Sequence, residues 1–405
     1  MIERADVVVI GSGGLGAATA FYLVQRGAGH VVLVDKHDLG SQTSPRAAGM
    51  AAHARASDLM VELMKAASTK LKRFTEDTGQ PLAWTQSGSL KVARRPEDAE
   101  LLVREHARAR AFGLDVELIS PQAAHRRNPI LEPEGVLAVM WAADDLYFEP
   151  SQVAIGFARG AEAAGASLLP HTTVTRVGIE EGRVTAVETN TGTIRTPVVV
   201  DAAGAWTRQV AALSGIRVPI VPTRHQLFIT EAIQGVHADL PMMRIMDAGV
   251  YVRPCDGGLL WGVFEEAPRQ YDMDSLGASF QIRDLDLNPD VLWRAAEDVK
   301  RQLPALRTAS VREHRGGIPT MTADGQHIVG PAPGARGFFI AGGCNVAGLS
   351  ISPAIGDALA MWIIDGSPPL DLAPLSLERF GPEWQSEDKL RENAAWQYRH
   401  FYGST

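Results

Sequence analysis

The sequence predicts two architectures in one chain: an α/β, Rossmann-like domain and an α+β domain whose sheet is mainly antiparallel. Three observations support this fold class. The N-terminal residues follow the order strand, glycine-rich turn, helix, strand. Residues 218–264 alternate apolar and polar side chains, which is typical of an antiparallel sheet with one solvated face. The chain has 405 residues, which is more than one hydrophobic core usually supports.

The opening unit begins with a strand that is predicted to be buried on both faces. Residues 6–10 read DVVVI without alternation, which is the pattern of such a strand. An alanine-rich helix is predicted over residues 17–26, with Gly27 ending it, and a second buried strand over 31–34. Two strands joined by one helix imply parallel pairing through a right-handed crossover.

The turn between the first strand and the helix has the spacing GxGxxG. Gly11 permits the tight turn, Gly13 lets a pyrophosphate approach the backbone, and Gly16 lets the helix pack closely on the strand. Free N–H groups at the helix start favour an anion. Asp35 ends the second strand, where an acid binds a ribose hydroxyl and disfavours the extra phosphate of NADP. We therefore predict a dinucleotide site.

The remaining elements follow from local patterns along the chain. Further helices are predicted over residues 52–78, 96–112, 151–164, 288–303 and 353–365. Further strands are predicted over residues 88–93, 167–175, 183–189, 193–200 and 337–343. Both ends of this series resemble nucleotide-fold pieces, so one domain is expected to be discontinuous. The expected boundaries are 1–83, 146–217 and 319–366 for the nucleotide domain, 84–145 and 218–318 for the substrate domain, and 367–405 for a C-terminal helical tail.

Composition argues against several classes of partner. The 39 Lys and Arg residues against 47 Asp and Glu residues give a net charge of −8, which disfavours nucleic acids and anionic membranes. Cys255 and Cys344 are too few for a disulfide framework and fit a reducing compartment. The histidines show no metal-binding spacing, so no metal site is predicted. No apolar run approaches a membrane span, and the early first strand leaves no signal peptide, so a cytoplasmic location is expected.

A second glycine-rich strand, turn and helix at residues 337–357 favours FAD over NAD. A simple NAD-dependent dehydrogenase does not need this unit, whereas a flavin that is buried along its length requires further backbone donors beside its ring. Gly343, Asn345 and the helix start at 348–350 are placed to supply such donors.

Six segments in order carry a family resemblance: GSGGLG at 11–16, VVLVD at 31–35, GSQTSPRAAGM at 40–50, DAAGAW at 201–206, GGIPTMTADGQHIVGPAPG at 316–334 and FFIAGGCNVAGLSISPAIGDALA at 338–360. With them the chain resembles the D-amino-acid oxidase superfamily of flavoproteins, and within it the FAD module of the dimethylglycine and sarcosine dehydrogenase/oxidase group. The resemblance spans about residues 5–365. It implies an FAD-binding domain, a sheet-based substrate domain and oxidation of a C–N bond.

The resemblance also implies which residues form the site. His225 and Tyr251 match a histidine and a tyrosine that the group places beside the flavin, and they are the candidate catalytic residues. His53, His314 and Arg315 remain open candidates for contact with the ring or the substrate. The expected cofactor-binding residues are Gly11, Gly13, Gly14, Leu15, Gly16, Asp35, Lys36, Ser44, Arg46, Ala47, Gly49, Met50, Val174, Ala203, Gly204, Trp206, Gly317, Gly343, Asn345, Gly348, Leu349 and Ser350.

Departures from the family refine these expectations. Where some relatives attach the flavin through a histidine this chain has Arg46, and the segment 316–319 lacks the cysteine that others use, so noncovalent FAD is expected. Leu260 stands near the position of an oxygen-activating lysine, which slightly favours a dehydrogenase over an oxidase.

The predicted function is FAD-dependent oxidation of a secondary or tertiary amine of the N-methyl amino acid type, with demethylation through an iminium. Two alternatives remain open: a glycine or D-amino-acid type oxidase, and the flavin subunit of a hetero-oligomeric amine dehydrogenase. The expected partners are a small-molecule amine and, in the last case, an electron-acceptor protein or partner subunits.

Overall fold

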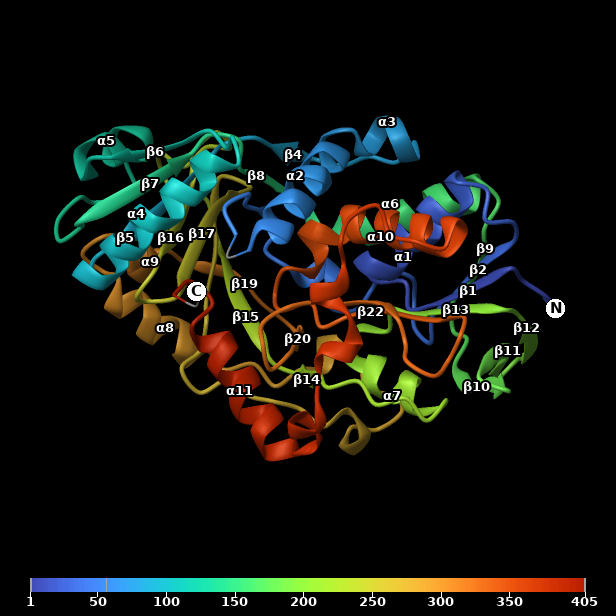
Figure 1. Ribbon diagram of the computed structural model, residues 1–405. Coiled ribbons are helices and arrows are strands. Elements are labelled where there is room, and N and C mark those ends of the chain that lie inside the picture. Colours follow the sequence, from blue (N-terminus) through green and yellow to red (C-terminus); the bar gives the residue numbers. More distant parts are fainter. Residues whose placement is uncertain (1, 56, 404–405) are drawn as a thin grey trace.

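Two sheets organise the molecule in the computed structural model, which describes residues 2–55 and 57–403. A six-stranded sheet has the order β21-β22-β13-β1-β2-β9, and an eight-stranded sheet has the order β19-β15-β18-β17-β16-β5-β7-β6. They lie at opposite ends of an elongated molecule (Figure 1). The predicted fold class, a Rossmann-like α/β part with a mainly antiparallel α+β part, is confirmed.

The six-stranded sheet is parallel except at one edge. Its central strand pair places Val9 of β1 opposite Leu33 of β2. Both side chains are fully buried, because helices or further strands cover both faces of the sheet. β21 alone runs antiparallel, against β22. The strands are β1 (Val7–Ile10), β2 (Val31–Val34), β9 (Ser167–Leu169), β13 (Val198–Asp201), β21 (Ile328–Pro331) and β22 (Phe338–Gly342). A small sheet of β10 (Val174–Glu180), β11 (Arg183–Thr189) and β12 (Gly192–Arg195) adjoins it.

Three helices pack together on the six-stranded sheet: α1 (Gly14–Gln25), α6 (Pro150–Ala163) and α10 (Gly348–Asp365). α1 and α10 approach closely at Gly356, where a Cβ atom would lie 2.7 Å from the backbone carbon of Ala18. Their apolar side chains form the largest core cluster with residues of β1 and β2.

Four predicted helices differ from the observed ones. The helix expected over 288–303 is shorter, α8 (Pro289–Asp298), and the helix expected over 17–26 begins earlier, at Gly14 of α1. The helix expected over 52–78 is α2 (Asp58–Lys72) followed by α3 (Phe74–Thr78), and residues 52–55 are not helical. Ser57 sets the start of α2, because its side chain accepts a hydrogen bond from the N–H of Met60. Residue 56 lies outside the described residues.

The helix expected from Pro353 begins one turn earlier, at Gly348, so that Pro353 lies inside α10. Proline cannot donate to the carbonyl of Leu349, four residues before it. The Ser352 hydroxyl donates to that carbonyl instead, over 2.9 Å, which satisfies the acceptor and lets the helix continue through the proline.

The eight-stranded sheet contains six antiparallel strand pairs and one parallel pair, β16–β5. One face packs on α8 (Pro289–Asp298) through a cluster that includes Phe228 and Trp261. The other face of the eight-stranded sheet is directed toward the six-stranded sheet. The strands are β5 (Ser89–Ala93), β6 (Val116–Ile119), β7 (Ala138–Ala142), β15 (His225–Thr230), β16 (Met242–Ile245), β17 (Val250–Cys255), β18 (Gly258–Val263) and β19 (Val311–Gly317). α4 (Pro96–Ala111) lies beside β5 and β7.

The two sheets take their strands from different segments of the chain, and the domain boundaries stay a prediction. Every strand of the six-stranded sheet falls in 1–83, 146–217 or 319–366, and every strand of the eight-stranded sheet falls in 84–145 or 218–318. No helix within the described residues is both long and apolar enough to cross a membrane.

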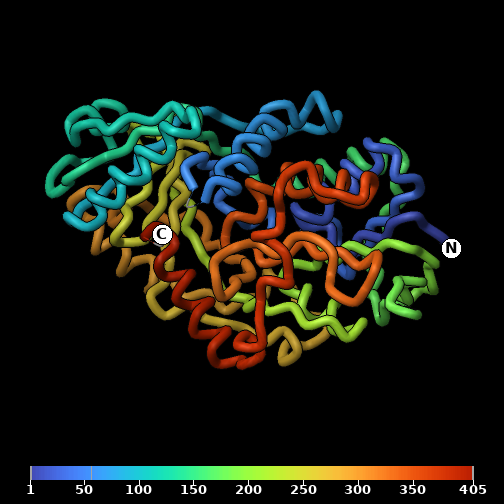
Figure 2. Tube along the Cα trace, viewed as in Figure 1, coloured from blue at the N-terminus to red at the C-terminus, as the bar shows by residue number. Residues whose placement is uncertain are grey.

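The C-terminal tail connects the two ends of the molecule. After α10 it crosses back toward the eight-stranded sheet, so that the C-terminus lies beside that sheet and far from the N-terminus (Figure 2). Its helix α11 (Glu387–Arg399) buries Leu390, Ala394 and Tyr398 against Leu227 and Tyr251 of the sheet. The tail therefore forms one wall of the space between the sheets.

Candidate active site

Two cavities meet where the glycine-rich turn opens between the sheets. The larger, of about 420 Å³, is here called the long cavity, and the smaller, of about 280 Å³, the small cavity. Gly13, Ser44 and Gly204 line both. A ligand at the start of α1 can therefore extend into both cavities.

The small cavity lies at the end of β2. The Asp35 carboxylate accepts hydrogen bonds from the N–H and hydroxyl of Ser12, at 2.8 and 2.6 Å, and from the N–H of His37 at 2.8 Å. The Lys36 ammonium lies 4.0 Å from the centre of the Trp206 ring, and burial lowers the pKa of Lys36. The predicted residues that line this cavity are Gly11, Gly13, Asp35, Lys36, Ser44, Val174, Ala203, Gly204 and Trp206.

The glycine positions of the turn fit a bound pyrophosphate. Gly11 has a φ of +98°, and a Cβ atom there would lie 2.5 Å from the carbonyl oxygen of Ala202. A Cβ at Gly16 would lie 1.9 Å from the carbonyl oxygen of Gly11, so Gly16 supports the turn without lining either cavity. A Cβ atom at Gly13 would have only the Ser44 hydroxyl near it, at 3.3 Å. The start of α1 is thus accessible to an anion at this point.

The long cavity continues the site toward the second glycine-rich unit. The Nε atom of Arg46 is buried there without a hydrogen-bond partner among the described residues. Burial and the charge of Arg315 lower the pKa of Arg46. An unpaired buried donor on this wall fits a polar edge of a flavin. The predicted residues that line this cavity are Gly13, Gly14, Leu15, Ser44, Arg46, Ala47, Gly49, Met50, Gly204, Gly317, Asn345, Gly348, Leu349 and Ser350.

Gly343 lies outside both linings and shapes the turn that carries Asn345. It has a φ of +59°, and a Cβ atom there would lie 2.6 Å from Thr322. Asn345 holds the same turn, because its amide donates to the Gly343 carbonyl and its side-chain oxygen accepts from the N–H of Thr322. The two cavities together present glycine-rich backbone from Asp35 to Asn345, which fits a molecule of the length of FAD.

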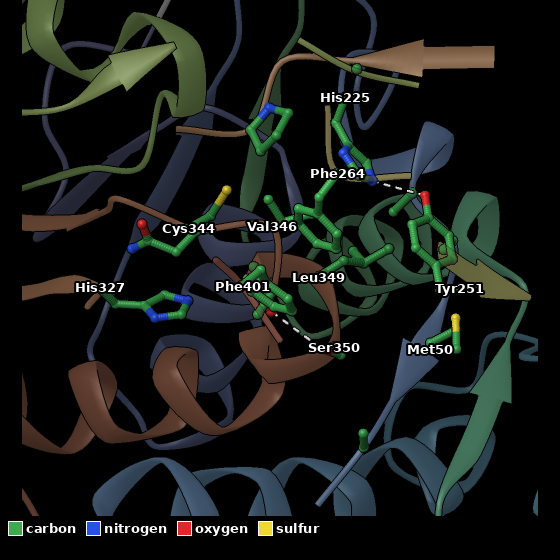
Figure 3. Close-up of a pocket in the computed structure, with 18 of the residues that line it drawn as sticks. Met50, His225, Tyr251, Phe264, His327, Cys344, Val346, Leu349, Ser350 and Phe401 are labelled. Carbon is green, nitrogen blue, oxygen red and sulfur yellow. Dashed lines mark hydrogen bonds between the residues drawn. The ribbon is translucent and has the colours of Figure 1, made fainter. Parts of the chain in front are cut away.

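The two candidate catalytic residues are in direct contact. The Nε2 atom of His225 lies 2.8 Å from the Tyr251 hydroxyl oxygen, and its Nδ1 atom lies 2.6 Å from the hydroxyl oxygen of Tyr398 (Figure 3 draws the first contact). His225 and Tyr251 both line the long cavity. The sequence predicted this pair but not Tyr398, which comes from α11.

Burial sets the protonation of this group. It lowers the pKa of His225 to about 3, so the imidazole is neutral near pH 7 and has one N–H donor and one acceptor nitrogen. One ring nitrogen is protonated and the other is an acceptor, so one of the two tyrosines donates to the ring and the other accepts from it. Burial also raises the pKa values of both tyrosines well above their ordinary range.

Strand pairing explains how Tyr251 reaches His225. Gly262 of β18 stands between Leu227 of β15 and Tyr251 of β17 in one row across the sheet. A Cβ atom at Gly262 would lie 2.2 Å from the Tyr251 hydroxyl. The absence of a side chain at Gly262 therefore gives the phenol ring its space.

Aromatic side chains enclose the group. The Phe264 ring lies 4.9 Å from the His225 ring and stacks on Phe401, with ring centres 4.5 Å apart and planes 12° apart. Tyr402 packs edge-on against Phe264. Figure 3 shows Phe264 and Phe401 between His225 and Tyr251 on one side and His327 and Cys344 on the other.

Several residues of the long cavity were not found from the sequence. His327 is 1% exposed, and neither ring nitrogen has a partner among the described residues. Burial, with the charges of Arg55 and Arg379, lowers its pKa to about 3. Arg55, Arg244 and Tyr402 also line this cavity. The row that contains Arg244 depends on pairing between distant strands, and local patterns do not reveal such pairing.

The three open candidates lie elsewhere. His53 precedes α2 instead of lying inside the helix expected over 52–78, and it is buried with its Nδ1 atom 2.9 Å from the Asp145 carboxylate. His314 contacts the Gln226 side chain, and Arg315 pairs with Glu313 at 2.7 Å. None of the three lines either cavity.

Comparison with known proteins agrees with this geometry. Residues 6–362 match the family model described as DAO, FAD dependent oxidoreductase. The chain is 31% identical to mitochondrial sarcosine dehydrogenase of Mus musculus over 384 residues, which covers 93% of this chain and 42% of that protein. It is 28% identical to mitochondrial dimethylglycine dehydrogenase of Rattus norvegicus over 405 residues, which covers 96% of this chain and 47% of that protein. The chain thus spans less than half the length of these two relatives.

A solved structure extends the likeness to three dimensions. The crystal structure of L-proline dehydrogenase from P. horikoshii superposes with a TM-score of 0.84 at 27% identity, and the match covers 94% of this chain and 98% of that one.

Proposed function

The chain belongs to the DAO family of FAD dependent oxidoreductases, and from that premise we propose that it oxidises a secondary or tertiary amine of the N-methyl amino acid type. Bound FAD supplies the acceptor for a hydride from the carbon next to the amine nitrogen. The substrate iminium that results is hydrolysed by water to an aldehyde and the demethylated amine. The names of the sarcosine and dimethylglycine dehydrogenases support this substrate class.

The observation that carries the proposal is the contact between His225 and Tyr251 on the wall of the cavity that contains the flavin-binding residues. Hydride loss requires an amine nitrogen with a free lone pair. Neutral His225 donates to the Tyr251 oxygen, and the Tyr251 hydroxyl proton is then free to point toward the amine nitrogen. This hydrogen bond orients a neutral amine in the cavity.

The aromatic wall has a second role in the proposal. Phe264, Phe401 and Tyr402 separate the pair from solvent at the tail side, and a site with little water strengthens each polar contact with the substrate. Tyr398 acts through His225 and is a positioning residue.

We propose that FAD is held without a covalent bond. Cys344, His225 and His327 are the cysteine and histidine residues in the described lining of the long cavity. Both nitrogens of His225 are engaged by tyrosines, and Cys344 accepts a contact from the N–H of Thr320 at 3.3 Å.

Anaerobic mixing with a panel of amines tests the proposed function. N-methyl amino acids are expected to bleach the visible absorbance of the purified holoenzyme, whereas primary amino acids leave it unchanged. Bleaching by glycine or D-amino acids alone would favour the glycine-type oxidase instead. Subsequent admission of air or of an artificial acceptor separates oxidase from dehydrogenase by the rate at which the absorbance returns.

A further inference from the structure

A buried ion pair lies behind His225, on the side of its strand that is turned away from the long cavity. Its members, Arg224 and Glu265, are 5% and 4% exposed. The Nη2 atom of Arg224 donates to one carboxylate oxygen at 3.0 Å, and the Nε atom donates to the other at 3.3 Å. Arg224 and Gln226 flank His225, and successive side chains along a strand point to opposite faces. The described lining of the long cavity accordingly includes His225 and neither of its two neighbours.

The Glu265 carboxylate joins both neighbours of His225. Besides the two hydrogen bonds from Arg224, its Oε1 atom accepts a hydrogen bond from the Gln226 side-chain amide at 3.0 Å. The Gln226 side-chain oxygen in turn accepts from the N–H of Asn288 at 2.9 Å. We call Arg224, Gln226 and Glu265 the clamp. It fixes the chain immediately before and after His225 through one carboxylate.

The clamp also fixes the aromatic side chain that packs on His225. Phe264 directly precedes Glu265, and its ring centre lies 4.9 Å from that of His225. The same ring lies 5.2 Å from the ring of Tyr398 and 6.2 Å from that of Tyr251. Figure 3 shows Phe264 beside His225 in the wall of the cavity. Movement of Glu265 would therefore displace a ring that touches the whole hydrogen-bonded group.

Stability alone does not account for a charged pair at this position. Burial of charge is costly, and a buried ion pair is often no more stabilising than apolar side chains of the same volume. Burial works to lower the pKa of Arg224, but the hydrogen bonds to Glu265 outweigh it and hold that pKa above its ordinary value, so the guanidinium stays charged. Its paired N–H donors bind a carboxylate in one fixed geometry. The pair thus provides a defined position for the two segments that it joins.

We propose that Glu265 and Arg224 are positioning residues that act through His225. The clamp sets the rings of His225 and Phe264 relative to each other, and it thereby aligns the hydrogen bond between His225 and Tyr251 with the substrate amine. The inference deepens the proposed function and rests on it for the effect on rate. A shift of about 1 Å at a reacting group can lower a rate by about 100-fold. Loss of the clamp should therefore lower the limiting rate of flavin reduction and leave the substrate Kd nearly unchanged.

A double variant, Arg224→Gln with Glu265→Gln, provides the first test, because it removes both charges and leaves neither of them buried without its partner. It is expected to bind FAD as the wild type does. Its limiting rate of anaerobic reduction by N-methylglycine should be lower by about 10- to 100-fold, with the Kd of the amine within a few fold. Arg224→Lys keeps the charge but not the paired donors, so its rate should lie between those of the wild type and the double variant.

Arg94 and Asp247 supply a matched control on the same sheet. Arg94 follows β5 and Asp247 follows β16, their closest atoms are 2.7 Å apart, and each side chain is 13% exposed. Neither residue lines either cavity. The double variant Arg94→Gln with Asp247→Asn should lower the Tm and leave both the limiting rate and the Kd unchanged.

Three results would overturn the proposal. They are a wild-type limiting rate in the clamp double variant, an equal loss of rate in the control variant, and a loss that appears only in the Kd of the amine.

Nuclear magnetic resonance of the His225 ring nitrogens gives a readout that does not depend on turnover. In holoenzyme labelled with ¹⁵N-histidine, the signals of His225 are those that disappear in His225→Gln. They should shift in the clamp double variant, because the ring moves relative to its hydrogen-bond partners, and stay in place in the control variant. Unshifted signals in the clamp variant would contradict the positioning role. If no amine reduces the flavin, the proposed function fails, but these signals still decide whether the clamp positions His225.

Discussion

His225 carries no charge between about pH 4 and pH 10, because burial holds its pKa at about 3. Any pH dependence of flavin reduction in this range must therefore come from another group, and the substrate ammonium is the main one. We expect the limiting rate of flavin reduction divided by the substrate Kd to rise with pH. The midpoint of this rise should equal the pKa of the free amine. Stopped-flow reduction at pH 6–10 measures this profile.

His225→Ala is expected to lower the limiting rate of reduction at least tenfold, because Tyr251 loses its hydrogen-bonded partner, and to leave the shape of the pH profile unchanged. His225→Gln, which keeps one donor and one acceptor, should recover part of the rate. A pKa that disappears from the profile in His225→Ala would show that the histidine does titrate and would contradict this account.

His327 gives the folded protein a specific sensitivity to acid. The folded state holds the ring neutral down to a pKa of about 3, whereas an unfolded chain takes up the proton near pH 6.5. Stability contributed in this way is present above pH 6.5 and is lost as the pH falls toward 3, by about 1.4 kcal/mol for each pH unit.

The free energy of unfolding should therefore fall between pH 7 and pH 5 by about 2 kcal/mol less in His327→Leu than in the wild type. Urea unfolding at the two pH values measures the difference. Equal losses in both proteins would mean that His327 is protonated in the folded state.

Among the elements, the turn from β1 to α1 allows FAD binding and the stability of the fold to be tested by two different glycine variants. Gly13→Ala adds a methyl group where only the Ser44 hydroxyl is near, at 3.3 Å, so the protein should fold with little loss of stability. The same methyl group occupies the place of a pyrophosphate, and the Kd for FAD is expected to rise at least tenfold.

Gly16→Ala is the contrasting variant, because its methyl group meets the Gly11 carbonyl at 1.9 Å. It should lower both the Tm of the apoprotein and FAD binding. Fluorescence titration of each apoprotein with FAD, with parallel Tm measurements, tests the pair. An unchanged FAD affinity in Gly13→Ala would place the pyrophosphate elsewhere.

The limits of sequence-based prediction are clearest at the level of elements. The residues at Gly11, Gly13 and Asp35 could be predicted because one local strand–helix–strand unit specifies all three. His225 and Tyr251 required a family resemblance, because they meet through the β15–β18–β17 pairing of distant segments. Arg244 and Tyr402 gave no signal, because their meeting depends on a tail that crosses the molecule. The predicted start of α10 at Pro353 was wrong, because no sequence pattern reveals that the Ser352 hydroxyl accommodates the proline inside the helix.

At the scale of the whole molecule, the residues that line the two cavities come from nearly every part of the chain, from Ile10 to Tyr402. Binding of FAD should therefore stabilise the entire protein, by about 2.7 kcal/mol when free FAD is at 100 times its Kd. We expect the Tm to rise with added FAD and both sheets to unfold in one transition. Differential scanning calorimetry at several FAD concentrations measures both.

Noncovalent binding gives a further expectation at this scale. Precipitation with trichloroacetic acid should leave all of the flavin in the supernatant and none with the protein. Yellow colour that stays with the precipitate would require a covalent bond, and Cys344→Ser and His327→Leu would then identify the attachment residue.

The position of α11 also affects the order in which the protein is made. All six strands of the six-stranded sheet have been synthesised once residue 342 has been added, and α10 is complete at residue 365. Tyr398, Phe401 and Tyr402 are added later. Because N-terminal parts fold first during synthesis, a nascent chain can hold a complete cofactor fold while the wall beside Tyr251 is still missing. FAD can thus bind during translation before the C-terminal tail covers the long cavity beside Tyr251.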